Sequence, residues 1–375
     1  MKKIKIFVSA LEYSANIHLF YLLNALQKKQ LEFEICGIFD SEILKRDSSF
    51  SPNEFRVMGF VEVLRLIPKF FKIKKALIAL AKECDFALFM DSSSFNIPLL
   101  KSLHQAKNKP YLAYYILPQV WAWKPYRAKI FSVYCDALWG ILPFEGFYYP
   151  KTSNFSYVGH PLLDEIPFSY TKANSTNFIA FMPGSRISEI KALFPVFKEL
   201  VKHFKTMNKK ALLIIPRHFK NRDLSKIYGD LRDFEISFET YEGLKQCEFA
   251  FVCSGTATLE STLLGIPTIL VYKARWLDYW IAKRLVKLNY IGLANIFLEF
   301  LAYGSPKNNH NPQNFPIHAE FLQDQVKVET LLKAFYKFDN EKFFAQKEKL
   351  IQYLKNGSAE NCARKIENFV KNLQN

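Results

Sequence analysis

The clearest chemical pattern in the chain is a turn between a short apolar run and an amphipathic segment. Phe178 to Met182 is apolar, Pro183-Gly184-Ser185-Arg186 follows, and apolar residues then recur at helical spacing from Ile190 to Val201. This predicts a strand, a tight turn and a helix. Glycine lets backbone approach a ligand, serine can cap the helix, and the free N–H groups of a helix start favour anions. With Arg186 as a cation, the turn is a candidate phosphate site; the alternative is an ordinary turn with a solvated arginine.

A second turn of this type follows the predicted strand Phe249 to Cys253. Its residues are Ser254-Gly255-Thr256-Ala257-Thr258-Leu259-Glu260, whose small side chains expose N–H and hydroxyl donors at a helix start. Glu260 lies one turn into that helix, where it is placed to reach the hydroxyls of a ribose. The sequence therefore predicts two phosphate-binding turns in the second half of the chain.

In the first half, carboxylates follow predicted strands. Asp91 ends the buried run Phe86 to Met90, and Glu12 lies on the loop after the first predicted strand, Ile4 to Ala10. Open α/β sheets bind ligands at the carboxyl ends of their strands, so Asp91 is placed to take a proton from a substrate hydroxyl. The alternative is that Asp91 caps the following helix.

Apolar and basic residues also gather in the first half. Trp121 and Trp123 lie beside prolines in a predicted loop, where they either plug the end of the sheet or line an apolar cleft. Lys69 to Lys82 predicts a basic helix with apolar residues at Phe70, Ile73, Leu77 and Leu80. Such a helix either lies on an anionic membrane surface or packs on its own sheet with its lysines in water.

Strands and helices alternate in both halves of the chain, which predicts two doubly wound sheets. At 375 residues the chain exceeds the length, about 250–300 residues, at which one core stops growing. We expect one domain over residues 1–166, a linker within 165–176, and a second domain over 167–340. Two amphipathic helices, Glu341 to Lys355 and Ala359 to Leu373, close the chain and are expected to pack back on the first domain or to be exchanged in a dimer.

Composition narrows the function classes. A net charge of +16 favours an acidic partner such as phosphorylated substrates or anionic lipid, whereas the absence of zinc-finger or RNP-type motifs argues against nucleic acid. Six cysteines without a C-x-x-C pair predict reduced thiols and no metal site. The amino terminus has a short apolar run without a cleavage site and predicts a first strand, so the chain is expected to be cytoplasmic.

With these residues laid out, the chain resembles the lipid A disaccharide synthase family, glycosyltransferases of the GT-B fold. The matching stretches occur in the family's order over nearly the whole chain: Met58 to Leu64, Phe95-Asn96, Pro118 to Trp123, Leu142 to Glu145, Val158 to Leu162, Pro183 to Arg186, Ser254 to Glu260, Ala282 to Lys287 and Phe321 to Gln323.

The resemblance implies two Rossmann-like domains facing across a cleft. It also implies inverting transfer of 2,3-diacylglucosamine from UDP-2,3-diacylglucosamine to 2,3-diacylglucosamine 1-phosphate, which gives a β-1,6 disaccharide and UDP without a cofactor or metal. An inverting displacement needs one base, and Asp91 matches it by position. By the same matching, Glu12 is the acid of the first loop. The UDP-sugar site would comprise Gly184, Ser185, Arg186, Ser254, Gly255, Thr256, Thr258, Glu260, Asn295, Glu320 and Gln323. The acceptor and lipid site would comprise Met58, Asn96, Trp121, Trp123 and Arg127.

The family's substrates carry acyl chains and phosphates, so the resemblance further implies peripheral association with the inner membrane, and a homodimer is expected by analogy. The chain departs from the family pattern at three places: Leu11 to Asn16 lacks both usual glycines and the Asp, Ser92-Ser93-Ser94 replaces Ala-Pro-Asp, and an insertion from Ser305 to Pro316 lengthens the segment before Glu320. Two alternatives remain. One is another GT-B enzyme acting on a UDP-amino sugar, either an epimerase or a transferase with a polyprenyl acceptor; the other is a basic module that binds nucleic acid or anionic lipid.

Overall fold

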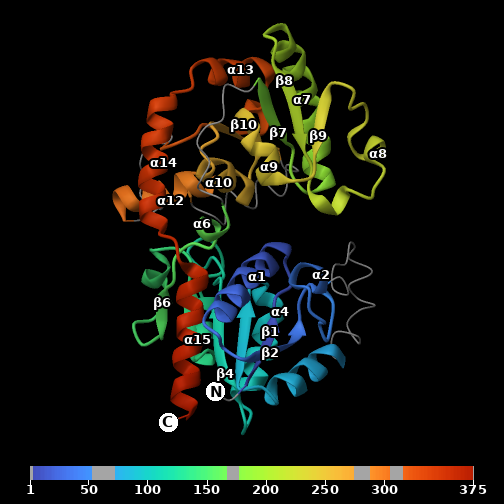
Figure 1. Cartoon of the computed structure of the whole chain (residues 1–375). Coiled ribbons are helices and arrows are strands. Elements are labelled where there is room, and N and C mark those ends of the chain that lie inside the picture. Colours follow the sequence, from blue (N-terminus) through green and yellow to red (C-terminus); the bar gives the residue numbers. More distant parts are fainter. Residues whose placement is uncertain (1–2, 53–71, 167–176, 274–287, 305–315, 375) are drawn as a thin grey trace. The chain divides into compact units, whose positions relative to one another are not determined.

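The computed structural model describes residues 3–52, 72–166, 177–273, 288–304 and 316–374 (Figure 1). The chain divides into two compact units. The first contains Met1–Glu165 and Leu354–Asn375, and the second contains Ile166–Tyr353. Each unit has its own six-stranded sheet in which every neighbouring pair of strands is parallel. The expectation of two Rossmann-like sheets is therefore confirmed.

The first unit has the strand order β2-β1-β3-β4-β5-β6. The strands are β1 (Ile4–Ser9), β2 (Phe33–Ile38), β3 (Phe86–Met90), β4 (Tyr111–Tyr115), β5 (Ala137–Gly140) and β6 (Phe155–Tyr157). The helices are α1 (Tyr13–Lys28), α2 (Ser41–Leu44), a helix over 72–82, α4 (Ser93–His104), α5 (Arg127–Tyr134), the 3₁₀ turn η2 (Glu145–Tyr148), α6 (Leu162–Glu165) and α15 (Ser358–Gln374).

Alternating residues of the central strand β3 enter two separate cores. Phe86 and Leu88 pack with α1 and α15 on one face of the sheet, whereas Ala87 and Phe89 pack with α4 and the helix over 72–82 on the other. Because successive side chains of a strand point to opposite faces, a strand that is apolar throughout must be covered on both sides. This explains why the run FALFM carries no polar residue.

The helix over 72–82 settles one of the open alternatives. Its apolar residues Ile73 and Leu77 are buried in the core with Phe89, and Lys72, Lys75 and Lys82 are exposed. The described part of this helix therefore packs on its own sheet and does not present its apolar face to a membrane. Lys69 and Phe70 lie outside the described residues.

The second unit has the strand order β12-β11-β10-β7-β8-β9. The strands are β7 (Phe178–Met182), β8 (Lys210–Ile214), β9 (Phe234–Ser237), β10 (Cys247–Cys253), β11 (Thr268–Tyr272) and β12 (Glu320–Leu322). The helical segments are α7 (Ile187–Thr206), η3 (Arg217–Phe219), α8 (Leu224–Tyr228), α9 (Thr240–Lys245), α10 (Thr256–Leu263), α12 (Leu293–Tyr303), η4 (Gln323–Gln325), α13 (Val328–Tyr336) and α14 (Asn340–Leu354). Phe181 and Phe251 stack at the centre of its core, with ring centroids 5.6 Å apart.

The carboxyl-terminal helix α15 belongs to the first unit, although it follows α14 in the chain (Figure 1). It packs against α1, and Lys29, the residue that caps the end of α1, forms ion pairs with Glu360 and Glu367. Asp164 accepts hydrogen bonds from the backbone N–H groups of Gly357 and Ala359, which satisfies free donors at the start of α15. The first sheet is thus covered on one face by residues from both ends of the chain.

Candidate functional site

Asp91 lies directly after β3, at the carboxyl edge of the first sheet. Its Oδ2 accepts a hydrogen bond from the backbone N–H of Glu12 at 3.0 Å, and its Oδ1 is buried without a hydrogen-bond partner. Burial raises the pKa of Asp91 to about 6, against hydrogen bonds that lower it. The side chain does not cap α4, whose N-cap residue is Ser92. Asp91 is therefore a half-buried carboxylate with one oxygen fixed and the other unpaired.

The backbone of Asp91 is held in an unusual conformation by buried polar groups. Asp91 and Ser92 have φ angles of 46° and 23°, a region that few non-glycine residues adopt. Asn96 donates from Nδ2 to the carbonyl of Met90 (2.9 Å) and accepts from Ser9 Oγ (2.6 Å), and the Tyr114 hydroxyl donates to the carbonyl of Asp91. Asn96 is fully buried, so these contacts assign it to the support of Asp91 rather than to contact with a lipid.

Glu12 and Arg127 lie near Asp91 in the fold. Glu12 precedes α1, and its side chain is exposed. Arg127, the first residue of α5, donates from its guanidinium to the hydroxyls of Ser93 and Ser94, the latter at 3.0 Å. The segment after Asp91 is thus fastened on one side by Asn96 and on the other by Arg127.

The two predicted tryptophans have different environments. Trp121 is buried, and its ring meets that of Phe144 edge to face, so it plugs the end of the sheet. Trp123 is 42% exposed and lies under the ammonium group of Lys124. Of these two tryptophans, only Trp123 is exposed enough to contact a ligand or lipid in the described structure. Met58 lies outside the described residues.

In the second unit, the turn after β7 has the predicted shape. Gly184 has a φ of 103°, and a Cβ atom there would lie 2.5 Å from Glu189 Oε2 and 3.1 Å from Cys253 Sγ, so the position requires glycine. Ser185 does not cap α7; the N-cap is Arg186, whose N–H donates to Glu189 Oε2. The Arg186 side chain is 75% exposed, although it also pairs with Glu189. The turn therefore presents a cation next to a helix start.

The turn after β10 lies beside the turn after β7, because β7 and β10 are adjacent and parallel. Gly255 is the N-cap of α10, with a φ of 147° and open space where a side chain would be. Ser254 is half-buried and Thr256 is exposed, but Thr258 is buried and its hydroxyl donates to the carbonyl of Gly255 at 2.8 Å. Thr258 is therefore not exposed as expected, since its hydroxyl shapes the turn; a contact of this residue with a UDP-sugar stays a prediction. Glu260 is half-buried within α10.

The remaining polar residues of the predicted UDP-sugar site form a buried network. Asn295 donates from Nδ2 to Glu320 Oε1 at 2.7 Å, and Glu320 accepts from the N–H groups of Ile291 and Gly292. Burial raises the pKa of Glu320. This network fixes the loop that precedes α12. Gln323 follows β12 with a φ of 51° and is half-buried.

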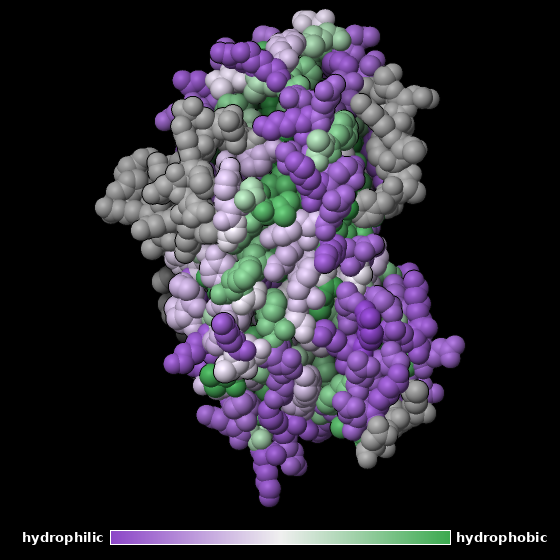
Figure 2. Space-filling model, turned by 90° about the vertical axis from the view of Figure 1, so that its left-hand side faces the viewer, coloured by the Kyte–Doolittle hydropathy of each residue, from purple (hydrophilic) through white to green (hydrophobic). Residues whose placement is uncertain are grey.

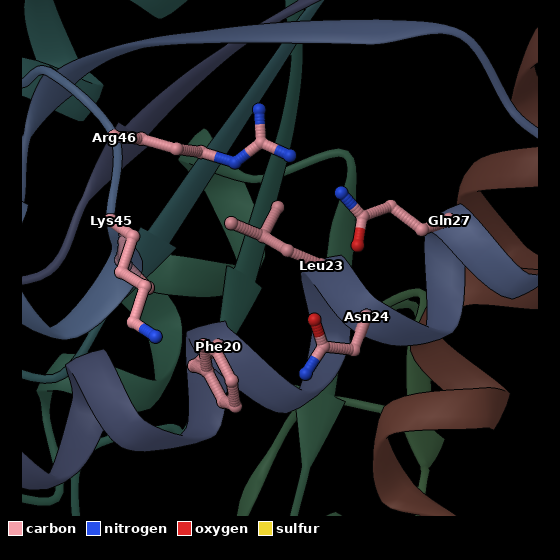
Figure 3. Close-up of a pocket in the computed structure, with 7 residues that line it drawn as sticks. Phe20, Leu23, Asn24, Gln27, Lys45 and Arg46 are labelled. Carbon is pink, nitrogen blue, oxygen red and sulfur yellow. The ribbon is translucent and has the colours of Figure 1, made fainter.

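Three supporting residues were not predicted from the sequence: Ser9, Tyr114 and Glu189. Ser9 is a polar residue at the end of a mostly apolar strand, which is a usable signal, whereas nothing local distinguishes Tyr114 from the other two tyrosines of β4, Tyr111 and Tyr115. A surface pocket of about 270 Å³ lies elsewhere in the first unit, lined by residues of α1 and of the segment around α2 and by none of the candidate residues (Figure 3).

The chain matches a known protein family along nearly its whole length. The family described as lipid-A-disaccharide synthetase matches residues 6–363. The lipid-A-disaccharide synthase of Helicobacter pylori is 45% identical over 373 residues, which cover 98% of this chain and 99% of that protein.

Solved structures agree on the fold. A putative UDP-N-acetylglucosamine 2-epimerase from Listeria monocytogenes has a TM-score of 0.56 at 13% identity, covering 96% of this chain and 94% of that chain. A glycosyltransferase from Streptomyces nogalater has a TM-score of 0.53 at 12% identity, covering 97% and 99%. These identities show the fold alone. The match along nearly the whole sequence shows more: the chain belongs to the lipid-A-disaccharide synthetase family of glycosyltransferases.

Proposed function

We propose that this chain forms the lipid A disaccharide by transferring 2,3-diacylglucosamine from UDP-2,3-diacylglucosamine to the 6-hydroxyl of 2,3-diacylglucosamine 1-phosphate. Membership of the family supports the reaction class. The observation that carries the assignment of the base is the environment of Asp91: a carboxylate at the carboxyl edge of a parallel sheet, with Oδ1 unpaired and a pKa raised to about 6 by burial.

In the proposed reaction the acceptor oxygen forms a bond to the anomeric carbon of the donor while the bond from that carbon to the UDP oxygen breaks. Asp91 Oδ1 takes the proton of the acceptor hydroxyl, and UDP leaves with the bonding electrons. One displacement inverts the α-linked donor to a β product. The fixed Oδ2 keeps the carboxylate oriented, so that only Oδ1 takes part in proton transfer.

We assign the leaving diphosphate to the two adjacent turns of the second unit. Gly184 and Gly255 keep side chains away from the backbone there, Arg186 supplies an exposed cation, and Thr256 begins α10 with free N–H groups. Donors of this kind stabilise negative charge as it develops on a leaving group. Asn295 and Glu320 act indirectly, through the loop before α12.

We also propose that the acyl chains and the membrane surface meet exposed aromatic residues of the first unit. Trp123 follows β4, Phe147 follows β5 and is 84% exposed, and Tyr126 is 60% exposed. These loops follow adjacent parallel strands and therefore share one edge of the sheet. No helix among the described residues is long and apolar enough to cross a membrane. The face drawn in Figure 2 carries both hydrophilic side chains and smaller apolar areas.

The test is direct. The purified chain is incubated with UDP-2,3-diacylglucosamine and 2,3-diacylglucosamine 1-phosphate, and both UDP and the disaccharide are measured. We expect the two products in equal amounts. UDP-sugar isomerisation without disaccharide would favour the epimerase alternative, whose structural neighbours share the fold at low identity. Intact substrates in the presence of folded protein would instead favour a binding module.

A further inference from the structure

We propose that Arg127, Ser93 and Ser94 form the binding site for the phosphate monoester of the acceptor. This inference rests on the proposed function, because it concerns the substrate whose hydroxyl Asp91 deprotonates. It adds an anion site, with named ligating groups, to the first unit.

The first observation is the state of the Arg127 charge. Its guanidinium donates to two neutral hydroxyls, those of Ser93 and Ser94, and its Nε is buried without a partner. Within the described residues, Arg127 makes no ion pair with a carboxylate. A half-buried guanidinium without a counter-charge is unfavourable unless an anion occupies the site during function.

The second observation is the composition of the surrounding sequence. From Ser92 to Cys135 the chain contains neither Asp nor Glu, while it contains six Lys and Arg residues. Ser94 also stands where the family typically has Asp. The residue at this position, which bonds to Arg127, is therefore neutral in this chain. This segment therefore carries only positive formal charges, and the acidic side chains that the fold brings near Arg127 are Asp91, which precedes it, and Glu12.

The third observation is the hydroxyl pair itself. Each serine oxygen accepts from Arg127, which leaves its own hydroxyl proton available as a donor. A guanidinium with two hydroxyl donors is a set that suits a phosphate, whose oxygens accept several hydrogen bonds. A carboxylate would use fewer of these donors.

The position relative to Asp91 fits one substrate molecule. Ser93 and Ser94 follow Asp91 by two and three residues, so their Cα atoms lie within about 7–11 Å of it by chain length alone. The acceptor carries its phosphate on C1 and its nucleophilic hydroxyl on C6, which is attached to C5; C1 and C5 flank the ring oxygen, so a single sugar ring joins the two groups. A phosphate held by Arg127 would thus orient the ring with its hydroxyl toward the base.

The experiment measures equilibrium binding of two soluble probes, glucosamine 1-phosphate and glucosamine, to the full-length chain by calorimetry. Variants are Arg127→Gln, Arg127→Lys and, as a matched control, Lys129→Gln, which removes an exposed cation from the same helix. We expect the wild type and Lys129→Gln to bind the phosphorylated probe about 10- to 100-fold more tightly than glucosamine. Arg127→Gln should bind both probes equally, and Arg127→Lys should show an intermediate preference.

The inference is overturned if the wild type shows no preference for the phosphorylated probe or if Arg127→Gln keeps that preference. If Arg127 only braces the loop, the glutamine variant weakens both probes equally, which also rejects the site. Thermal melting of each variant shows whether it is folded. If Arg127→Gln is unfolded, the preference of Arg127→Lys for the phosphorylated probe decides the outcome. Failure of the proposed function would give a different result. The wild type would still prefer the phosphorylated probe, but the mixture of the two substrates would release no UDP.

Discussion

The backbone N–H of Glu12 donates to Oδ2 of Asp91 at 3.0 Å, which joins the start of α1 to the end of β3 across two neighbouring strands. The bond occupies one carboxylate oxygen and leaves Oδ1 without a partner. A carboxylate fixed in this way has one direction open for proton transfer.

Activity should depend on the ionisation of Asp91. Burial raises its pKa to about 6, and a general base works only when ionised, so kcat/KM should fall as the pH drops through about 6. The negative charge of the neighbouring Glu12 raises the pKa of Asp91. The variant Glu12→Gln removes this charge, so the acid limb of its pH profile should move to lower pH. Asp91→Asn should lower kcat by about 10²- to 10⁴-fold at pH values well above about 6, where the wild-type carboxylate is ionised, and should lose this acid limb. A pH profile of UDP release tests all three, and Asp91→Asn should still bind UDP. An unshifted limb in Glu12→Gln would argue against Asp91 as its source.

Tyr114 should support catalysis without touching substrate. Its hydroxyl donates to the carbonyl of Asp91, whereas the hydroxyl of the next residue, Tyr115, bonds to Ser358 on the other face of the sheet at 2.8 Å. Loss of one hydrogen bond costs about 1 kcal/mol, so Tyr114→Phe should lower kcat by about fivefold and leave the KM for UDP-sugar unchanged. Tyr115→Phe is the matched control, and it should change stability only. Equal kcat values for the two variants would reject the positioning role.

Glu145 should make stability fall with rising pH. It is buried after β5, its Oε2 accepts from the N–H groups of Ile141 and Leu142, and burial raises its pKa to about 8. In the unfolded chain the Glu145 carboxyl group loses its proton near pH 4.3, about where free glutamate does. In the folded chain the same group keeps its proton until about pH 8. Between these values the unfolding free energy should therefore decrease by up to about 1.4 kcal/mol per pH unit.

Glu145→Gln should remove this decrease, because an amide oxygen accepts the same two bonds and does not ionise. Urea unfolding of both proteins from about pH 5 to about pH 8 measures the difference. Glu42→Gln, which changes an exposed carboxylate of α2, should leave the slope as in the wild type. Parallel slopes for the wild type and Glu145→Gln would mean that Glu145 is not the source of the decrease.

The sequence predicted the strands that position the site, because their runs are mostly apolar and end at polar turns; β3 and β7 carry no polar residue, β1 carries Lys5 and Ser9, and β10 carries Glu248. The positions of the turns after β7 and β10 were predicted from the hydrophobic pattern on either side of them. Both turns lie at strand ends in the structure. Short or exposed elements were not predicted: α2 has only four residues, and β9 has two exposed residues of four. Such elements carry little hydrophobic pattern, so periodicity cannot reveal them.

The roles of individual polar side chains were harder to predict, because they depend on partners distant in sequence. Asn295 bonds to Glu320, and Asn96 bonds to Ser9. Thr258 has the residue type of a ligand-binding hydroxyl but turns back to its own loop. A sequence pattern locates a polar residue at a strand end, yet only tertiary packing decides whether that residue faces a ligand or supports one that does.

The carboxyl-terminal helix should stabilise the first unit specifically. Ile366 of α15 is 1% exposed in the core that contains Phe86, and Phe369 meets the Phe86 ring at 5.2 Å. Ile366→Ala should lower the unfolding free energy of this unit by about 2–5 kcal/mol, whereas Leu373→Ala, which alters an exposed residue of the same helix, should change it by less than about 0.5 kcal/mol. Hydrogen exchange followed by mass spectrometry reports each unit separately. Ile366→Ala should speed exchange in β1 and β3 and leave β7 and β10 protected, since α15 adds no core residue to the second sheet. Equal loss of protection in both sheets would show that the two units unfold together.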